Sequence, residues 1–112
     1  MNKKIAIPVT NGMLDEHFGH CAQFKLYTVI NNQVADETTI DAPPHQPGLL
    51  PPWLSQQGVT DVLAGGMGQR AIQLFNQNNV NVFVGAPMAS ANEIVQGFLS
   101  KSLSFSANYC DH

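Results

Sequence analysis

The sequence has little charge, and basic residues are especially few. Charged residues make up 12% of its 112 residues, and 5 Lys and Arg stand against 8 Asp and Glu, so the formal net charge is -3. A protein that binds a nucleic-acid backbone needs a concentrated positive surface. We therefore expect no nucleic acid among the partners of this protein.

Long hydrophobic runs are also missing. Asn, Gln, Gly and Pro interrupt the apolar residues throughout, so no stretch approaches the roughly 18 apolar residues of a membrane-spanning helix. The first apolar run, residues 5–9, is short and has no small-residue cleavage site after it, which argues against a secretory signal. These features predict a cytoplasmic protein with no membrane partner.

Cysteine is scarce, since the chain has only Cys21 and Cys110. Two cysteines are too few for a disulfide-stapled scaffold. With 44% hydrophobic residues, a chain of this length can bury enough surface to fold around a core, and we expect one domain over residues 1–112. A reducing compartment would keep both thiols free to act as ligands.

Signatures of conventional catalysis are absent too. The chain has no Gly-x-Ser-x-Gly nucleophile elbow, and the spacing of its carboxylates identifies no catalytic pair. It also lacks the Lys-Ser/Thr of a phosphate-binding P-loop and the complete Gly-x-Gly-x-x-Gly spacing of a dinucleotide site. We therefore predict a protein that is not an enzyme.

The sequence does contain a series of short apolar segments separated by turn residues. Asn31-Asn32 tolerates positive φ and predicts a hairpin turn, and three prolines make residues 41–48 a stiff connector. Strands are predicted at 5–9, 24–30, 33–40, 59–64 and 80–85, helices at 51–57, 69–77 and 90–99, and a weak edge segment at 103–108. This order predicts an α/β domain in which helices cover both faces of a mixed sheet.

Candidate ligand residues fall in the loops that this topology brings to one edge of the sheet. Open α/β sheets bind ligands beyond the carboxyl ends of their strands. If residues 103–108 run in the same direction as the first strand, both ends of the chain contribute to this edge. The loop residues concerned are His17, His20, Cys21, His45, the turn Gly65–Gly68, Cys110 and His112.

Cysteine and histidine are the ligands that favour zinc, copper(I) or iron–sulfur species. Two cysteines and four histidines could fill a tetrahedral site, but their spacing matches no structural zinc motif. The alternatives are solvated loop histidines and, for Cys21, an ordinary small residue of the core.

The turn Gly65-Gly66-Met67-Gly68 leads into a predicted helix. Glycines allow a ligand to approach the main chain, and the free N–H groups of a first helical turn favour negative charge. Arg70 would add a full positive charge. The turn could therefore hold the sulfides of an anionic cluster or a phosphate, or it could be a strand-to-helix turn that needs small residues.

Three motifs together resemble the dinitrogenase iron-molybdenum cofactor-binding (nitrogenase accessory factor) family. They are His-Phe-Gly-His-Cys at 17–21, Gly-Gly-Met-Gly at 65–68 and Asn-Tyr-Cys-Asp-His at 108–112. The resemblance implies a ribonuclease-H-like, three-layer α/β fold with a five-stranded mixed sheet. It also implies a small stand-alone member whose cluster-binding region includes His17, Cys21 and residues 65–68, without implying dedicated service to nitrogenase.

The preferred hypothesis is a non-catalytic carrier or scaffold for an anionic iron–sulfur or molybdenum–iron–sulfur cluster. Its ligands would be Cys21 and a loop histidine, the glycine turn would donate N–H groups to sulfide, and its partners would be proteins that donate and accept the cluster. One alternative is a regulatory domain that binds a small molecule or phosphate at the same turn. Another is a simple zinc enzyme with His17, His20 and Cys110 as ligands.

Overall fold

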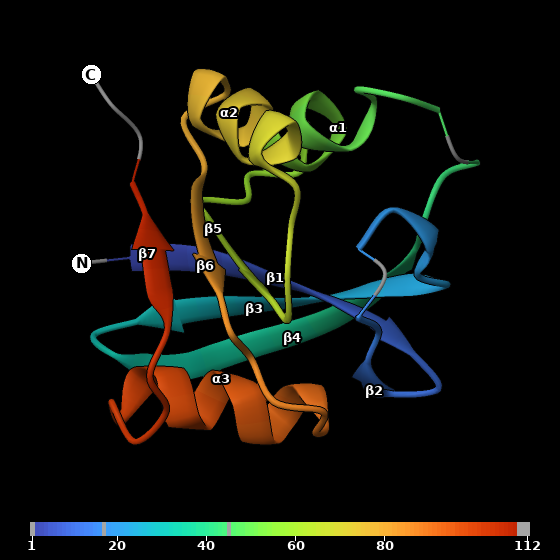
Figure 1. Ribbon diagram of the computed structural model, residues 1–112. Helices are drawn as coiled ribbons and strands as arrows, with labels where there is room; N and C mark the ends of the chain where they lie inside the picture. Colours follow the sequence, from blue (N-terminus) through green and yellow to red (C-terminus); the bar gives the residue numbers. More distant parts are fainter. Residues whose placement is uncertain (1, 17, 45, 110–112) are drawn as a thin grey trace.

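The computed structural model describes residues 2–16, 18–44 and 46–109, and Figure 1 shows their arrangement. The strands are β1 (Asn2–Thr10), β2 (Met13–Leu14), β3 (Gln23–Ile30), β4 (Gln33–Asp41), β5 (Asp61–Ala64), β6 (Asn81–Val84) and β7 (Ser106–Asn108). The helices are α1 (Leu50–Gln56), α2 (Gln69–Gln77), α3 (Ala91–Leu99) and the 3-10 turn η1 (Phe18–His20). No helix within these ranges is long and apolar enough to span a membrane.

The strands form one mixed sheet of seven strands in the order β4-β3-β1-β5-β6-β7, with β2 paired to β1. Strands β1, β5 and β6 are parallel, whereas β3 is antiparallel to both β1 and β4. Consequently β1, β4, β5 and β6 all end at one edge of the sheet, which we call the carboxyl edge. The edge where they begin is the amino edge.

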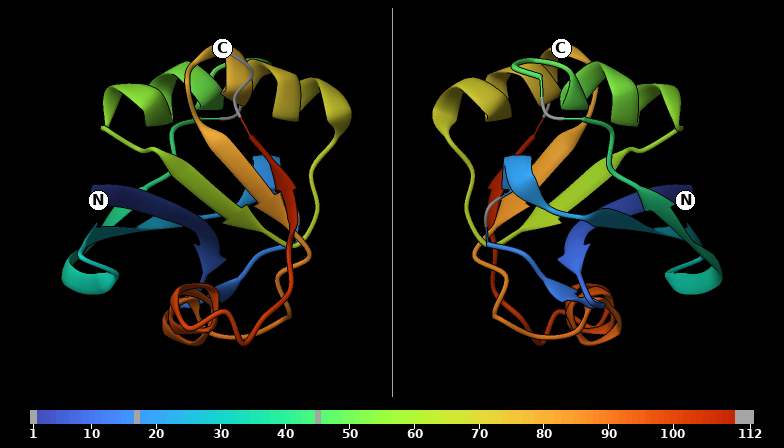
Figure 2. Two further views of the ribbon diagram at one scale, coloured as in Figure 1. Left: turned by 90° about the vertical axis from the view of Figure 1, so that its left-hand side faces the viewer. Right: turned by 90° about the vertical axis from the view of Figure 1, so that its right-hand side faces the viewer.

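Helices cover both faces of this sheet, with α1 and α2 on one face and α3 on the other (Figures 1 and 2). The strands bury side chains on both faces: Ala6 belongs to the core under α1 and α2, and Ile5 and Ile7 belong to the core under α3. The Cα radius of gyration is 12.5 Å, close to the roughly 13 Å expected for this length.

The predicted hairpin and helix starts are confirmed. Asn31 and Asn32 have φ values of 53° and 64°, and Ile30 pairs with Gln33 across the turn. Ser90 caps α3, because its Oγ accepts a hydrogen bond from the Glu93 N–H at 3.2 Å and donates to Glu93 Oε1 at 3.1 Å. The Ser90 side chain thus satisfies one of the free N–H groups in the first turn of α3.

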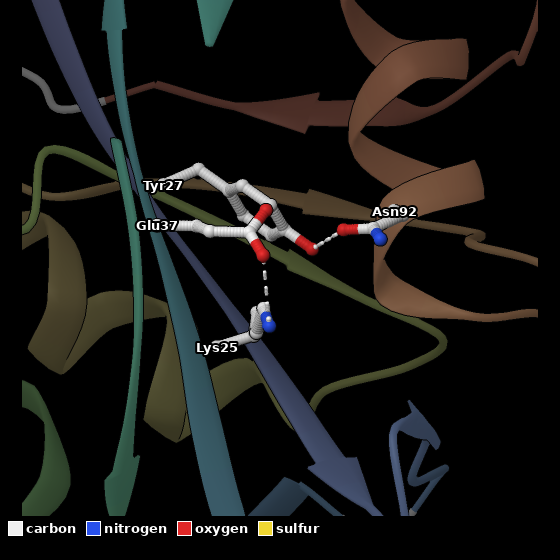
Figure 3. A network of polar contacts seen from close by, with 4 residues as sticks. All are labelled: Lys25, Tyr27, Glu37 and Asn92. Carbon is white, nitrogen blue, oxygen red and sulfur yellow. Dashed lines mark hydrogen bonds and ion pairs between the residues drawn. The ribbon is translucent and has the colours of Figure 1, made fainter. Parts of the chain in front are cut away.

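A polar network joins α3 to the sheet, as Figure 3 shows. The Tyr27 hydroxyl donates to Asn92 Oδ1 at 2.5 Å, and Lys25 Nζ lies 3.3 Å from Glu37 Oε1. Burial, and to a smaller extent the Glu37 carboxylate, raises the pKa of Tyr27 to about 12. The hydroxyl therefore keeps its proton and its hydrogen bond at neutral pH.

The prediction of five strands was wrong, because β2 and β7 also join the sheet. Strand β2 has only two residues, too few to show alternation in the sequence. Positive φ at Asn11 and Gly12 turns the chain back after β1, and the Leu14 N–H then donates to the Ala89 carbonyl at 2.9 Å. The segment after the first strand, where the sequence predicts no strand, therefore starts with a short hairpin between β1 and β2.

The direction expected for the tail was also wrong, since β7 is antiparallel to β6. After α3 ends, Lys101 turns the chain with φ 62°, and the N–H groups of Ser102 and Leu103 both donate to the Gly97 carbonyl. The segment before β7 therefore returns to the carboxyl edge, and β7 leaves it. Tyr109 consequently lies beside Phe83 and lines a cavity near the amino edge.

Candidate functional site

A cavity of about 390 Å³ lies at the carboxyl edge, on the face covered by α1 and α2. Three separate segments enclose it: the loop after β2, the proline connector after β4, and the glycine turn with the start of α2. The lining residues are Glu16, Phe18, Gln46, Pro47, Gly48, Leu50, Pro51, Gly66, Met67, Gly68, Ala71 and Leu74. The three loops that the sequence placed at one edge thus meet around one cavity.

Most of the wall is apolar. The Phe18 ring lies edge-on to Phe24 and Phe75, with ring centroids 5.7 and 5.4 Å apart. Those two partners are fully buried, so the ring that faces the cavity is anchored in the core. Helix α1 contributes Leu50 and Pro51 to the opposite wall. Such a wall limits the access of water to whatever occupies the cavity.

Residues at the start of α2 contribute main chain to the lining, besides the polar side chains of Glu16 and Gln46. Gly68 is the N-cap residue of α2, with φ -66° and ψ 151°, and no side chain caps the helix. The N–H groups of a first helical turn have no acceptor within the helix. The cavity therefore ends at a site whose donors and dipole favour negative charge.

The fold itself does not require glycine at positions 66 and 68. Neither residue has positive φ, and a Cβ atom built at either position would meet nothing within 4 Å. At Gly65 a Cβ would lie 3.4 Å from Leu14 Cδ2 and 3.6 Å from the Ala86 carbonyl oxygen, which is ordinary van der Waals contact. Small residues are thus unnecessary for the turn at 66 and 68, which leaves close approach of a ligand as a reason for them.

Two other residues of the predicted turn site do not line the cavity. Gly65 lies outside the lining, and its carbonyl accepts a hydrogen bond from the Gly85 N–H at 3.1 Å. Arg70 is exposed at the start of α2 and lies outside the lining. Its charge acts on the cavity only from the protein surface.

Cys21 packs in the core and does not line the cavity. It is 8% exposed, and burial, reinforced by the nearby Asp15 carboxylate, raises the pKa of its thiol to about 11. A thiol with such a pKa is protonated at neutral pH and is a poor ligand or nucleophile. The geometry therefore favours the alternative reading of Cys21 as a core residue.

Of the four predicted histidine ligands, the structure describes only His20. His20 is exposed at the end of η1 and does not line the cavity. His17, His45, Cys110 and His112 lie outside the described residues. However, Glu16, Phe18 and Gln46, which are neighbours of His17 and His45 in the sequence, do line the cavity. Across the described part of the chain, no three His, Cys, Asp or Glu side chains form a metal-binding group.

The condition for both chain ends to reach one site, a last segment parallel to the first strand, is not met. The described tail runs away from the carboxyl edge along β7, so Tyr109 and the glycine turn lie at different edges of the sheet. Cys110 and His112 themselves lie outside the described residues, so their part in a site stays a prediction.

Sequence reasoning missed most of the apolar wall. Phe18, Leu50 and Leu74 were not among the predicted site residues, yet each lines the cavity. Their partial burial follows from the angle between α1, α2 and η1, which no local pattern encodes. The adjacent helix face, Ala71 and Leu74 beside the buried Ile72 and Phe75, was the available signal.

The family described as dinitrogenase iron-molybdenum cofactor matches residues 1–101. The chain therefore belongs to this family, as its motifs suggested. The match ends before Cys110 and His112, so neither residue belongs to the part that defines the family.

Individual relatives are distant in sequence and similar in fold. An uncharacterized protein of Methanocaldococcus jannaschii is 28% identical over 105 residues, which cover 89% of this chain and 88% of that protein. The crystal structure of PH0822 has a TM-score of 0.81 at 24% identity and 95% coverage of both chains. The apo form of the orange protein from Desulfovibrio gigas has a TM-score of 0.77 at 21% identity and 97% coverage of both. These structural matches show a common fold.

Proposed function

We propose that the protein is a non-catalytic carrier that holds an anionic metal–sulfur cluster in the cavity at the carboxyl edge. One observation carries the proposal: an apolar-walled cavity of about 390 Å³ ends at an uncapped helix start whose two glycines the fold does not need. Membership of a family described by the iron-molybdenum cofactor supports the choice of ligand.

The proposed binding mode uses main-chain donors more than side-chain ligands. Sulfide and thiomolybdate groups carry negative charge on polarizable atoms, which the N–H groups near Gly66 and Gly68 and the dipole of α2 stabilise. The apolar wall formed by Phe18 and Leu50 lowers the local dielectric and strengthens these contacts. A cluster held mainly by such contacts can leave intact, as carriage requires.

Side-chain ligands in this proposal come from the loops next to the cavity. His17 and His45 are proposed to ligate, because residues adjacent to each in the sequence line the cavity. Cys21 is left out of the ligand set, since its protonated thiol lies in the core. Glu16, an exposed carboxylate in the lining, repels an anion from the mouth and so favours release.

The proposal also covers the fold description, the partners and the cellular location of the protein. The strand order β4-β3-β1-β5-β6, with only β3 reversed among these five, supports the ribonuclease-H-like description of one domain over residues 1–112. Partners would be proteins that supply and accept the cluster in the cytoplasm. A zinc enzyme has no support among the described residues.

Anaerobic reconstitution of the full chain with iron(II), sulfide and molybdate tests this function. We expect coloured protein with stoichiometric metal, and retention reduced by Ala71→Phe, which fills the cavity from a half-buried helical position. Gln73→Phe is the matched control, because Gln73 lies on the exposed face of the same helix. Colourless protein, or equal loss of metal from both variants, would refute the proposal.

A further inference from the structure

A second and larger cavity, of about 580 Å³, lies between the sheet and the end of α3. Its lining comes from the amino ends of β1, β5 and β6 and from the segment that leads into β7, and it shares no residue with the first cavity. The volume falls within the range of roughly 300 to 1,000 Å³ typical of small-molecule sites. Nothing in the function proposed above uses this cavity.

Aromatic side chains form one side of the second cavity. Phe98 contacts Phe83 and Phe105 edge-to-face, with ring centroids 4.9 and 5.6 Å apart, and Phe83 contacts Tyr109 at 5.6 Å with an interplanar angle of 89°. Tyr109 is 66% exposed, so its ring remains available to a ligand. Edge-to-face series of this kind leave ring faces on which a planar molecule can stack.

Two lysines supply positive charge to the same cavity. Lys3 Nζ lies 5.3 Å from the centre of the Phe98 ring, and Lys101 is exposed on the turn after α3. Within the described chain, neither lysine forms an ion pair with a carboxylate. Both ammonium groups are therefore positioned to bind an anionic group at the mouth of the cavity.

Asp61 provides a buried acceptor at the inner end. Its side chain is only 3% exposed, and its carboxylate accepts hydrogen bonds from Thr60 Oγ1 at 2.7 Å and from Asn81 Nδ2 at 3.2 Å. A carboxylate has about four acceptor positions, so these two bonds leave capacity for further N–H donors. The amide of Asn2 also lines the cavity.

We propose that the second cavity binds a planar heteroaromatic anion of the class of a nucleoside monophosphate. The ring would stack against Phe105 and Tyr109, its N–H groups would donate to Asp61, and its phosphate would lie by Lys3 and Lys101. A cationic ligand is disfavoured by the two lysines. A purely apolar ligand would cover the polar groups near Asp61 without replacing their hydrogen bonds to water, which is costly.

The test is to titrate the isotope-labelled full chain with five compounds and to monitor binding by amide chemical shifts. The compounds are adenosine monophosphate, guanosine monophosphate, adenosine, ribose 5-phosphate and tetramethylammonium. We expect one of the nucleotides to bind at least about fivefold more tightly than ribose 5-phosphate, with the largest shifts at Lys3, Asp61 and Tyr109. Lys3→Gln should weaken the nucleotide about fivefold and leave adenosine unchanged. Tyr109→Ser, at an exposed position, should weaken both.

Arg70→Gln is the matched control, because it removes a cation beside the first cavity and should leave nucleotide binding unchanged. The proposal is overturned if neither nucleotide binds better than ribose 5-phosphate or if tetramethylammonium binds better than both nucleotides. It is equally overturned if the largest shifts fall on residues 66–71. None of these outcomes depends on whether the first cavity holds a cluster.

Discussion

Replacing Gly66 and Gly68 by alanine separates the needs of the fold from the needs of a ligand. A Cβ atom at either position meets nothing within 4 Å, and neither residue has positive φ. Alanine at such positions restricts the unfolded chain and stabilises a protein by about 0.4 to 1 kcal/mol. Thermal unfolding of Gly66→Ala should therefore show a melting temperature equal to or above that of the wild type. Gly68→Ala should stay close to the wild type, because alanine is a poorer N-cap for α2 than glycine and this cost opposes the gain.

Cluster retention should change in the opposite direction. A methyl group beside the N–H groups keeps an anion from hydrogen-bond distance, and hydrogen bonds to charged groups contribute about 1.5 to 3 kcal/mol each. We expect the double variant to retain the cluster at least about tenfold less well, since tenfold corresponds to about 1.4 kcal/mol. Metal analysis after anaerobic reconstitution and gel filtration gives the measurement.

Gly97→Ala is the control for a glycine that packing does require. A Cβ atom at this position would lie 2.4 Å from Leu103 Cδ1, and overpacking of this kind costs about 1 to 3 kcal/mol. This variant should have a lower melting temperature than the wild type, and its folded fraction should take up the same amount of cluster as the wild type. The reasoning is refuted if Gly66→Ala and Gly68→Ala lose as much stability as Gly97→Ala, or if they are stable and bind the cluster as the wild type does.

Three further predictions concern buried groups and the start of α3. In a Cys110→Ser background, Cys21 should react with iodoacetamide at neutral pH at least about 100-fold more slowly than in the unfolded chain, because a pKa raised from 9.0 to about 11 lowers the thiolate fraction by that factor. Because the pKa of the Cys21 thiol is raised on folding from 9.0 to about 11, the protein should lose about 2 kcal/mol of stability from this group as pH rises from 9 to 11. Urea unfolding should show this loss. Cys21→Ala should remove the share due to the thiol and leave the share due to Tyr27, whose pKa is also raised on folding; a pH slope in Cys21→Ala equal to that of the wild type would contradict the prediction. Ser90→Ala removes the side-chain acceptor for the Glu93 N–H and should cost about 1 kcal/mol, whereas Ser106→Ala, at an exposed strand position, should cost much less.

Local signals predicted the central part of the fold well. The strand through Ile5 and Ile7, the Asn31-Asn32 turn and the helix that begins after Ser90 are all encoded within a few residues, and the structure confirms each. Strand β2 and the direction of β7 depend on contacts distant in sequence. The first needs the Ala89 carbonyl and the second needs Gly97 to accommodate Leu103.

The candidate site was predictable in position and less so in composition. Topology alone brings the loops after β2, β4 and β5 to the carboxyl edge, and Gly66 and Gly68 indeed line the cavity there. The sequence left Cys21 open between a ligand and a core residue, because its burial depends on residues distant in sequence, such as Phe75, that belong to the same core cluster. Likewise, the sequence of the loop that contains His20 does not show which of its side chains line the cavity.

The most direct test of the central claim is the position of a bound cluster, measured by the loss of amide signals near paramagnetic iron in the reconstituted protein. The account predicts that the amide signals of Gly66, Gly68 and Leu50 broaden beyond detection, while those of Lys3 and Tyr109 at the other cavity stay sharp. Sharp signals at Gly66 and Gly68 in a fully loaded protein, with broadening elsewhere, would contradict it.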